Sequence, residues 1–393
     1  MSIFDVEHQP RAHRVIQRAL ASRRMPHAYL FTGPHGVGRE MLALRLAQVL
    51  LCESPKNVEF PAYLQARNDE GNENLALDAC GECDDCRLVQ AGTHPDFAVI
   101  YRQLNREHSD STIRKQKALF ISIEVLREFM TERIGRRPAR GRAKVFVVRE
   151  AERLTDAAQN SLLKTLEEPP PDTFIILVTA ALDRMLPTTQ SRCQPVMFAP
   201  LPTDFVAQRL LALRPETSPE ESTFAARHSA GSLGAALKFI DDGLFATKQN
   251  WGEQALAWVR LARGFAPNSL AAPFLADAQT IGKLAADQYP DMSDTDAARA
   301  GLFALLAILG GFYQDAQRQA TGAAVEIVNA DQPTVIDALA SSLSSQQLVA
   351  SMQQIAQADS AIGRNANLEL TIETMFIGLA AIAQGHSPLF ARQ

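Results

Sequence analysis

The sequence predicts an α/β domain built on a parallel β-sheet with helices on both faces, followed by an all-helical region. Up to about residue 199, short apolar runs typical of buried strands alternate with helical segments, which is the pattern of a parallel sheet. After Pro200 and Pro202 no convincing strand pattern follows. Residues 203–243 suggest a group of short helices, and the Ala-, Leu- and Gln-rich remainder is expected to be helical throughout.

The individual elements of the α/β domain follow from local patterns. Strands are expected at the apolar runs 28–32, 97–101, 144–148, 174–178 and 196–198. Helices are expected at 11–24, which is basic and amphipathic, and at 41–51, 123–134 and 156–166. Ser122 and Thr155 are expected to cap the last two helices. Two polar stretches are expected outside regular structure, 53–79 as an exposed insertion and 103–118 as a loop.

Composition limits the class of protein. The chain has 393 residues, of which 46% are hydrophobic and 21% charged, as in ordinary globular proteins of two or three domains. A net charge of -5 argues against a protein whose main role is coating DNA. No apolar run of about 18 residues is present, so we expect no membrane span. The N-terminus lacks the apolar core of a signal peptide, which predicts a cytoplasmic protein.

A phosphate-binding loop is present in register, with unusual residues at its two working positions. Residues 33–40 have the spacing G-x-x-x-x-G-K-[ST] between a strand and a helix, as this motif requires. Gly33, Gly36 and Gly38 are the glycines of the loop, but Arg39 replaces the Lys and Glu40 the Ser or Thr. The carboxylate of Glu40 at a helix N-terminus can occupy the phosphate site and repel a triphosphate. We therefore expect a nucleotide-binding fold in which Gly33, Gly36, Gly38 and Arg39 form a degenerate, inactive loop.

The acidic pair that normally holds Mg²⁺ and orients the attacking water is also altered. It should follow the strand 144–148, where the chain has Arg149 and then Glu150. A cation at the first position opposes Mg²⁺ binding. The alternative is that Arg149 is simply a solvated charge at a strand end. Both interpretations predict that the chain does not hydrolyse ATP by itself.

Three closely spaced cysteines indicate a metal site. Cys80, Cys83 and Cys86 form C-x-x-C-x-x-C, and Cys52 is the only cysteine upstream of them. Thiolates at this spacing can converge on one Zn²⁺, and four of them would make a closed, structural site. His94 is an alternative fourth ligand, although the simpler interpretation is that it is a loop residue. An iron–sulfur cluster also fits the ligand count, but nothing else in the sequence suggests redox chemistry.

Two arginine-containing segments remain open to more than one interpretation. Arg192, in Ser191-Arg192-Cys193, is either part of an ordinary surface ion pair or an arginine finger that stabilises charge on a neighbouring chain's γ-phosphate. The stretch 133–144 is strongly basic and either contacts a nucleic-acid backbone or is a solvated loop near a subunit contact. No aromatic residues interleave with its arginines, so base stacking is not expected.

Taken together, these motifs resemble the AAA+ clamp-loader family, and within it the non-hydrolysing subunits of the bacterial DNA polymerase III clamp loader. The resemblance rests on the residues 27–34, on the cysteine cluster after the first helix of the sheet domain, on the run 160–170 and on Ser191-Arg192-Cys193. It covers roughly residues 1–240. It implies an AAA+ RecA-like domain at 1–199 with a zinc-binding insertion at about 52–86, a small helical lid at 200–244, and a helical collar for oligomerisation at 245–393.

The resemblance also assigns roles to individual positions. Motor subunits of the family carry a sensor-2 Arg in a G-S-x-R pattern, where this chain has Gly234. Thr179 matches the sensor-1 position. The departures at Arg39, Glu40, Arg149 and Gly234 are similar to the non-hydrolysing type. Arg192 is then implied to be the finger donated in trans to a motor subunit.

The implied partners are the motor subunits and the delta subunit of the complex, with the sliding clamp and primer–template DNA contacted through the complex. A structural zinc is the expected metal, and hydrolysis of ATP by this chain is not expected. One alternative is an ATP-hydrolysing motor subunit with a variant phosphate loop. A second is a zinc-dependent hydrolase, which would need an open metal coordination position.

Overall fold

The computed structural model describes residues 2–65, 75–140, 142–260, 268–288, 294–322, 326–364 and 366–385. The chain divides into two compact units, residues 1–202 and 203–393, and each is described by itself. The expected division of the second unit into a lid and a collar stays a prediction. Part of the expected insertion, residues 66–74, lies outside the described residues.

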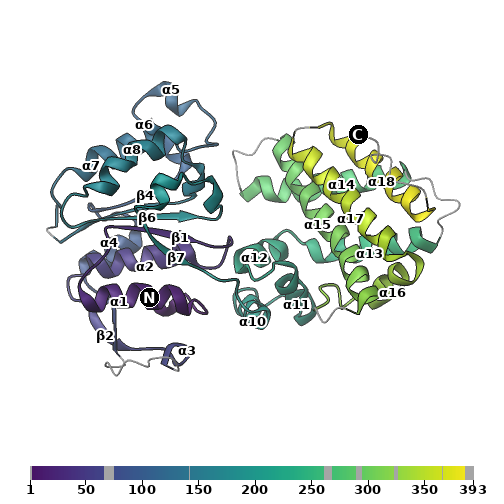
Figure 1. The fold of residues 1–393 in the computed structure, drawn as a ribbon, viewed down its shortest axis with the longest axis horizontal. Helices are drawn as coiled ribbons and strands as arrows, with labels where there is room; N and C mark the ends of the chain where they lie inside the picture. Colours follow the sequence, from purple (N-terminus) through teal and green to yellow (C-terminus); the bar gives the residue numbers. More distant parts are fainter. Residues whose placement is uncertain are drawn as a thin grey trace. The chain divides into compact units, whose positions relative to one another are not determined.

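The first unit is built on a five-stranded parallel sheet in the order β4-β5-β6-β1-β7 (Figure 1). Its strands are β1 (Ala28–Thr32), β4 (Phe97–Ile100), β5 (Lys144–Val148), β6 (Thr173–Thr179) and β7 (Gln194–Met197). The expected fold class, a parallel sheet with flanking helices followed by a helical region, is confirmed. The first strand lies between β6 and β7, so the loop that follows it emerges at the carboxyl edge of the sheet, where open α/β sheets bind ligands.

Helices cover both faces of this sheet, as the alternating pattern predicts (Figure 1). On one face lie α1 (Pro10–Ser22) and α2 (Arg39–Leu51), which contact the sheet through β7 and through β1, β5 and β6 respectively. On the other face, α6 (Ile123–Leu126) and α8 (Asp156–Glu167) bury apolar side chains against the strands. The buried strand β5 explains the uninterrupted apolar run in the sequence, because both of its faces are covered.

Local capping follows the sequence expectation. The Ser122 hydroxyl accepts the Val125 backbone N–H at the start of α6, and that of Thr155 accepts the Ala158 N–H at 3.2 Å at the start of α8. The helix expected at 123–134 is formed in three parts. A π-helical turn, Arg127–Thr131, separates α6 from α7 (Glu132–Ile134).

Two stretches expected to be irregular contain regular structure. In the insertion, β2 (Lys56–Glu59) pairs antiparallel with β3 (Leu75–Asp78), and α3 (Ala62–Gln65) follows β2. The first of these strands is largely exposed, so its sequence carries no apolar alternation and its pairing with β3 defines it. The region 103–118 contains a 3-10 helix, Arg102–Glu107, and α5 (Ser111–Arg114). The remaining short α-helices in the described part of this unit are α4 (Asp84–Ala91) and α9 (Pro187–Gln190).

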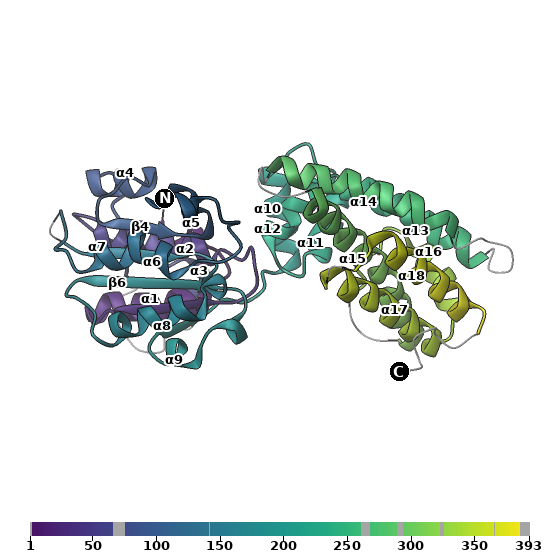
Figure 2. The same cartoon turned by 90° about the horizontal axis from the view of Figure 1, so that it is seen from above.

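The second unit is helical, and its described residues contain no strand. Its first three helices are α10 (Thr203–Leu213), α11 (Pro219–His228) and α12 (Leu233–Asp241). They are followed by α13 (Leu244–Arg260), α14 (Asn268–Gln288), α15 (Asp294–Thr321), α16 (Pro333–Ser342), α17 (Ser345–Gly363) and α18 (Leu368–Ala383). Figure 2 shows α14 and α15 running beside each other, and their close approach depends on Gly301, where a Cβ would lie 1.8 Å from the Ala278 carbonyl oxygen.

One described helix, α15, is long and apolar enough to cross a bilayer by length and composition alone. It packs against α14, α16 and α17, and residues such as Leu305 and Phe312 are buried in these contacts. This is the environment of the central helix in a bundle, so its apolar character is explained by packing within the unit.

A buried lysine joins the first helices of this unit to its bundle. Lys248 on α13 is fully buried and forms an ion pair with Asp331. Its ammonium lies 4.3 Å from the ring centre of Phe224 on α11 and 5.8 Å from that of Phe312 on α15. Burial lowers the pKa of Lys248, and the carboxylate of Asp331 opposes this shift. The paired charge and the rings therefore connect α11, α13 and α15.

Candidate functional site

The glycine loop has the backbone conformation that its sequence predicts. Gly33, Gly36 and Gly38 all have positive φ, at 150°, 68° and 94°. A Cβ on Gly33 would lie 2.5 Å from the backbone oxygen of Phe198, and one on Gly38 would lie 2.6 Å from a methyl carbon of Val6. These positions therefore require glycine for reasons of packing as well as conformation. The loop leads directly into α2, as in a phosphate-binding loop.

Arg39, at the position of the phosphate-contacting Lys, is buried in the structure. Its side chain is 6% exposed, and its Nε and Nη1 atoms have no hydrogen-bond partner within the described part of the chain. Burial lowers the pKa of this guanidinium, while the carboxylates of Glu152 and Glu40 favour its charge. The Nε and Nη1 donors of Arg39 are therefore shielded from solvent and from an approaching phosphate.

The two other unusual residues of the nucleotide site are paired with each other. Arg149 Nε lies 2.8 Å from Glu40 Oε2, so the cation that replaces the metal-binding acid binds the carboxylate that replaces the metal-binding hydroxyl. The Arg149 guanidinium also lies 5.8 Å from the ring centre of Tyr101. The ion pair spans the N-terminus of α2 and the carboxyl end of β5, where Mg²⁺ and the terminal phosphates would have to bind.

The remaining acidic and sensor positions are occupied by internal contacts. Glu150 has a positive φ of 47° and its carboxylate pairs with Arg102 Nε at 3.1 Å. Thr179 is fully buried at the end of β6, and its hydroxyl both donates to the Ala181 carbonyl and accepts the Ala181 N–H at 3.2 Å. In the second unit, Gly234 stands in the first turn of α12 and provides no side chain for a sensor role.

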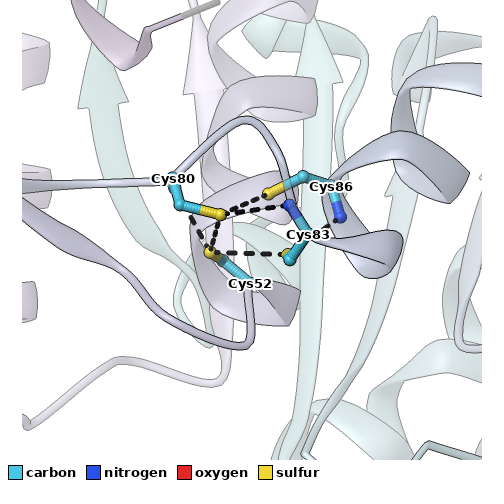
Figure 3. Close-up of side chains that lie close together, drawn as sticks. All are labelled: Cys52, Cys80, Cys83 and Cys86. Atoms are coloured by element: carbon cyan, nitrogen blue, oxygen red, sulfur yellow. Dashed lines mark hydrogen bonds between the residues drawn. The ribbon is translucent and has the colours of Figure 1, made fainter.

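The four cysteines converge at one place (Figure 3). Cys52 follows α2 as its C-cap, Cys80 follows β3, Cys83 is the N-cap of α4, and Cys86 lies in the first turn of α4. The Cys52 sulfur lies 3.5 Å from that of Cys80 and 3.9 Å from that of Cys83, and all four sulfur atoms lie within 4.8 Å of one another. These separations are too long for disulfides.

The geometry and chemistry of this cluster fit one tetrahedral Zn²⁺. Four sulfurs at about 2.3 Å from a central ion lie about 3.8 Å from one another, close to the separations observed. Backbone N–H groups of Glu82 and Cys83 donate to the Cys80 sulfur and lower its pKa to about 6, which favours the thiolate that a metal requires. Burial raises the pKa of the Cys52 and Cys86 thiols in the absence of a metal charge. An iron–sulfur cluster fits less well, because its own iron and sulfide atoms would have to separate the cysteines further.

His94 is engaged elsewhere and is not part of the cluster. Its Nε2 lies 3.2 Å from an Asp85 carboxylate oxygen, and its Nδ1 accepts the Asp96 backbone N–H at 3.0 Å. Asp85 also forms an ion pair with Arg140, whose guanidinium reaches Glu53 as well. The alternative of His94 as a metal ligand therefore finds no support in the geometry.

Half of the basic side chains in the stretch 133–144 serve the structure. Arg142 donates to the backbone oxygens of Cys52, at 2.7 Å, and of Glu53. Lys144 donates to the backbone oxygens of Arg133 and Arg136, and Arg140 pairs with acids beside the cysteines. The stretch is thus tied to the cysteine cluster, which the sequence did not suggest. The side chains of Arg133, Arg136 and Arg137 remain exposed, and a contact between them and DNA stays a prediction.

Arg192 follows the short helix α9 and lies on the surface of the first unit. Its Nε donates to Glu167 Oε1 at 2.8 Å, its Nη2 reaches the same oxygen, and its Nη1 donates to the Thr188 carbonyl at 2.8 Å. The side chain is 32% exposed. Arg192 therefore forms the surface ion pair that was one of the two interpretations of its sequence. This ion pair leaves the finger role open, because a partly exposed guanidinium can still bind a further ligand.

Comparison with known proteins defines the class. The sequence profile described as "DNA polymerase III, delta subunit" matches residues 8–202, and the one described as "DNA polymerase III, delta subunit, C terminal" matches residues 294–380. The chain belongs to the DNA polymerase III delta subunit family.

Individual relatives of known name show which subunits the chain is similar to. The DNA polymerase III subunit delta' of Escherichia coli K12 is 37% identical over 212 residues, covering 54% of this chain and 53% of the relative. The subunit of the same name from Bacillus subtilis is 30% identical over 205 residues, covering 52% of each chain. The chain thus matches about half the length of these relatives. A crystal structure of a DNA polymerase III gamma subunit-related protein from Thermotoga maritima aligns over 95% of this chain and 99% of that one, with a TM-score of 0.40 and 17% identity.

Proposed function

We propose that this chain is a subunit of the DNA polymerase III clamp loader that does not hydrolyse ATP itself and donates Arg192 to the ATP site of a neighbouring motor subunit. The observation that supports the proposal most strongly is the ion pair between Glu40 and Arg149, at the positions where a working site would hold Mg²⁺. The named relatives at 30–37% identity, called subunit delta', support the placement in the clamp loader.

The absence of hydrolysis follows from the chemistry of the filled site. Hydrolysis needs a cation on the terminal phosphates, a hydroxyl and an acid on Mg²⁺, and a group that orients water. Here the corresponding residues are a buried Arg39 and the paired Glu40 and Arg149. Thr179 is bound to its own turn, and Gly234 carries no side chain. The glycines of the loop would then be kept because they fit the closely packed turn between β1 and α2.

The finger role is supported by chemistry that Arg192 retains on the surface. A guanidinium is always charged at neutral pH and presents donors in a fixed fork that matches phosphate oxygens. In other nucleotide hydrolases a finger contributes a factor of about 10³–10⁵ to the rate. Bound in this way, ATP in the motor subunit would also link nucleotide state to subunit packing, so that the ring can open a sliding clamp and place it on primed DNA.

The cysteine cluster is proposed to hold a structural Zn²⁺. Four thiolates complete a tetrahedral shell and leave no position for substrate or water, so a zinc-dependent hydrolase is disfavoured. The ion would link the end of α2 to the start of α4. Through the Arg142 contact with Cys52 and Glu53, it would also hold the basic stretch in place.

The proposed partners are the motor subunits and the delta subunit, with the helical collar at residues 245–393 as the proposed site of assembly. The clamp and primer–template DNA would be contacted through the assembled complex, which places the protein in the cytoplasm with the replicating chromosome. The alternative of a motor subunit with a variant loop requires tight, Mg²⁺-dependent ATP binding and turnover by the isolated chain.

The finger is tested with complexes reconstituted from the full chain. The substitution Arg192→Ala is expected to leave subunit assembly intact. It should lower ATP hydrolysis at the motor-subunit site that Arg192 completes by orders of magnitude, as loss of an arginine finger does in other nucleotide hydrolases, and clamp loading should fall with it. Arg184→Ala, at an exposed arginine near Arg192 in the sequence, is the matched control and should leave both rates unchanged. Full rates with Arg192→Ala would show that the finger assignment is wrong.

A further inference from the structure

The guanidinium of Arg192 is held in one orientation by a carboxylate whose role the sequence motifs do not assign. Glu167 is the last residue of α8, and its Oε1 accepts hydrogen bonds from both Nε and Nη2 of Arg192. From the other side, the Thr188 carbonyl on α9 accepts from Nη1 at 2.8 Å. Two separate helices therefore fix the fork of one arginine.

The pattern of these bonds leaves part of the fork available. An arginine has five N–H donors, and Glu167 and Thr188 engage three of them, one on each nitrogen. The donors that remain belong to Nη1 and Nη2, the pair that can bind two phosphate oxygens at once. The Ser191 hydroxyl is a further, distant neighbour, 3.5 Å from Nη1. The side chain as a whole is 32% exposed, so it is partly open to solvent.

We infer that Glu167 is a positioning residue that orients Arg192 for the phosphate of a neighbouring subunit. The inference rests on the proposed finger role of Arg192. A surface arginine samples many rotamers, and an ordered one loses less freedom when the transition state forms. Glu167 also anchors the guanidinium to α8, a helix that packs against the sheet. The finger is therefore held by a rigid element of the fold.

The test uses the reconstituted complex with four variants of the full chain: Glu167→Ala, Glu167→Gln, Arg192→Ala and the double variant Glu167→Ala/Arg192→Ala. Glu167→Ala is expected to lower kcat for ATP hydrolysis about 10-fold while KM for ATP stays within about twofold, because only the orientation of the finger is lost. Glu167→Gln keeps one acceptor oxygen and should recover part of the rate. Glu168→Ala, at the adjacent exposed acid, is the control.

The double variant separates positioning from other effects. If Glu167 acts only through Arg192, the double variant hydrolyses ATP at the rate of Arg192→Ala alone. Additive losses, or an unchanged or faster rate for Glu167→Ala, would overturn the inference while leaving the finger in place. A normal rate for Arg192→Ala would instead remove the proposed function itself. Thermal unfolding of the free variants, expected to match the parent, checks that the exposed pair does not act through folding.

Discussion

The ion pair between Glu40 and Arg149 can be removed with little effect on folding, and this gives a direct way to reopen the nucleotide site. Its two side chains are 38% and 43% exposed, and the charged atoms are 2.8 Å apart. Coulomb's law in water gives about 1.5 kcal/mol at this distance, and exposed pairs measured in proteins contribute about 0.2–1 kcal/mol. We therefore expect a coupling energy below about 1 kcal/mol in a double-mutant cycle of urea unfolding with Glu40→Gln and Arg149→Gln.

The functional consequence should be much larger than the change in stability. The triple variant Arg39→Lys, Glu40→Thr and Arg149→Asp restores the cation, hydroxyl and acid of a working loop on an unchanged glycine turn. Calorimetric titration with Mg-ATP should detect no binding to the parent chain and Mg²⁺-dependent binding to the triple variant. The single variant Glu40→Thr should not bind, because Arg149 still occupies the metal position. Tight Mg-ATP binding by the parent chain would show that the Glu40–Arg149 pair does not block the nucleotide site.

Three further predictions concern the framework around the site. Gly33→Ala places a Cβ against a backbone oxygen at a residue with positive φ, and it should lower the free energy of unfolding of the first unit by about 3–6 kcal/mol. Gly92→Ala is also at positive φ but faces open space, so it should lower the free energy of unfolding by only about 1–2 kcal/mol; calorimetric unfolding measures both. Burial, assisted by the nearby lysine charge, lowers the pKa of His228 from 6.5 to about 4. The second unit should thus lose about 3 kcal/mol as pH falls from 6.5 to 4, a loss absent in His228→Phe. If the cysteines hold zinc as proposed, a chelator should speed amide hydrogen exchange at Ala139 and Arg140, whose N–H groups donate to the Asp96 carboxylate. Unchanged exchange would show that the loop containing Ala139 and Arg140 is held without a metal.

The sequence predicted the elements whose stability comes from burial in a regular pattern. The strands β1 and β5 were predicted to the residue, because both lie inside the sheet and consist of apolar runs. The hairpin of β2 and β3 was missed. Its first strand is exposed and polar, so pairing with a distant segment, and not composition, makes it a strand. The short helices in 103–118 were missed because each is too short for a periodic apolar pattern: each buries one apolar side chain, Leu104 or Ile113, and Asp110 caps the second locally.

In the candidate sites, too, only the residues set by a regular local pattern were predicted. Spacing alone predicted the glycine loop and three of the four clustered cysteines, and Cys52 followed because it is the only upstream cysteine. The partners of these groups could not be predicted, because they come from segments far apart in the chain. Examples are the Arg149 that binds Glu40 and the Glu167 that holds Arg192. A polar residue's type indicates what it can bind, while the fold decides which partner reaches it.

We propose that this chain has an inactive nucleotide site of its own and completes the ATP site of a neighbouring subunit. A structure of the reconstituted clamp loader with ADP and a metal fluoride that mimics the transferred phosphate tests both parts together. We predict no nucleotide at residues 33–40, and the Arg192 guanidinium within about 3 Å of the phosphate mimic in the adjoining motor subunit. Nucleotide bound at Gly33–Glu40, or Arg192 turned away from the mimic, would contradict the claim.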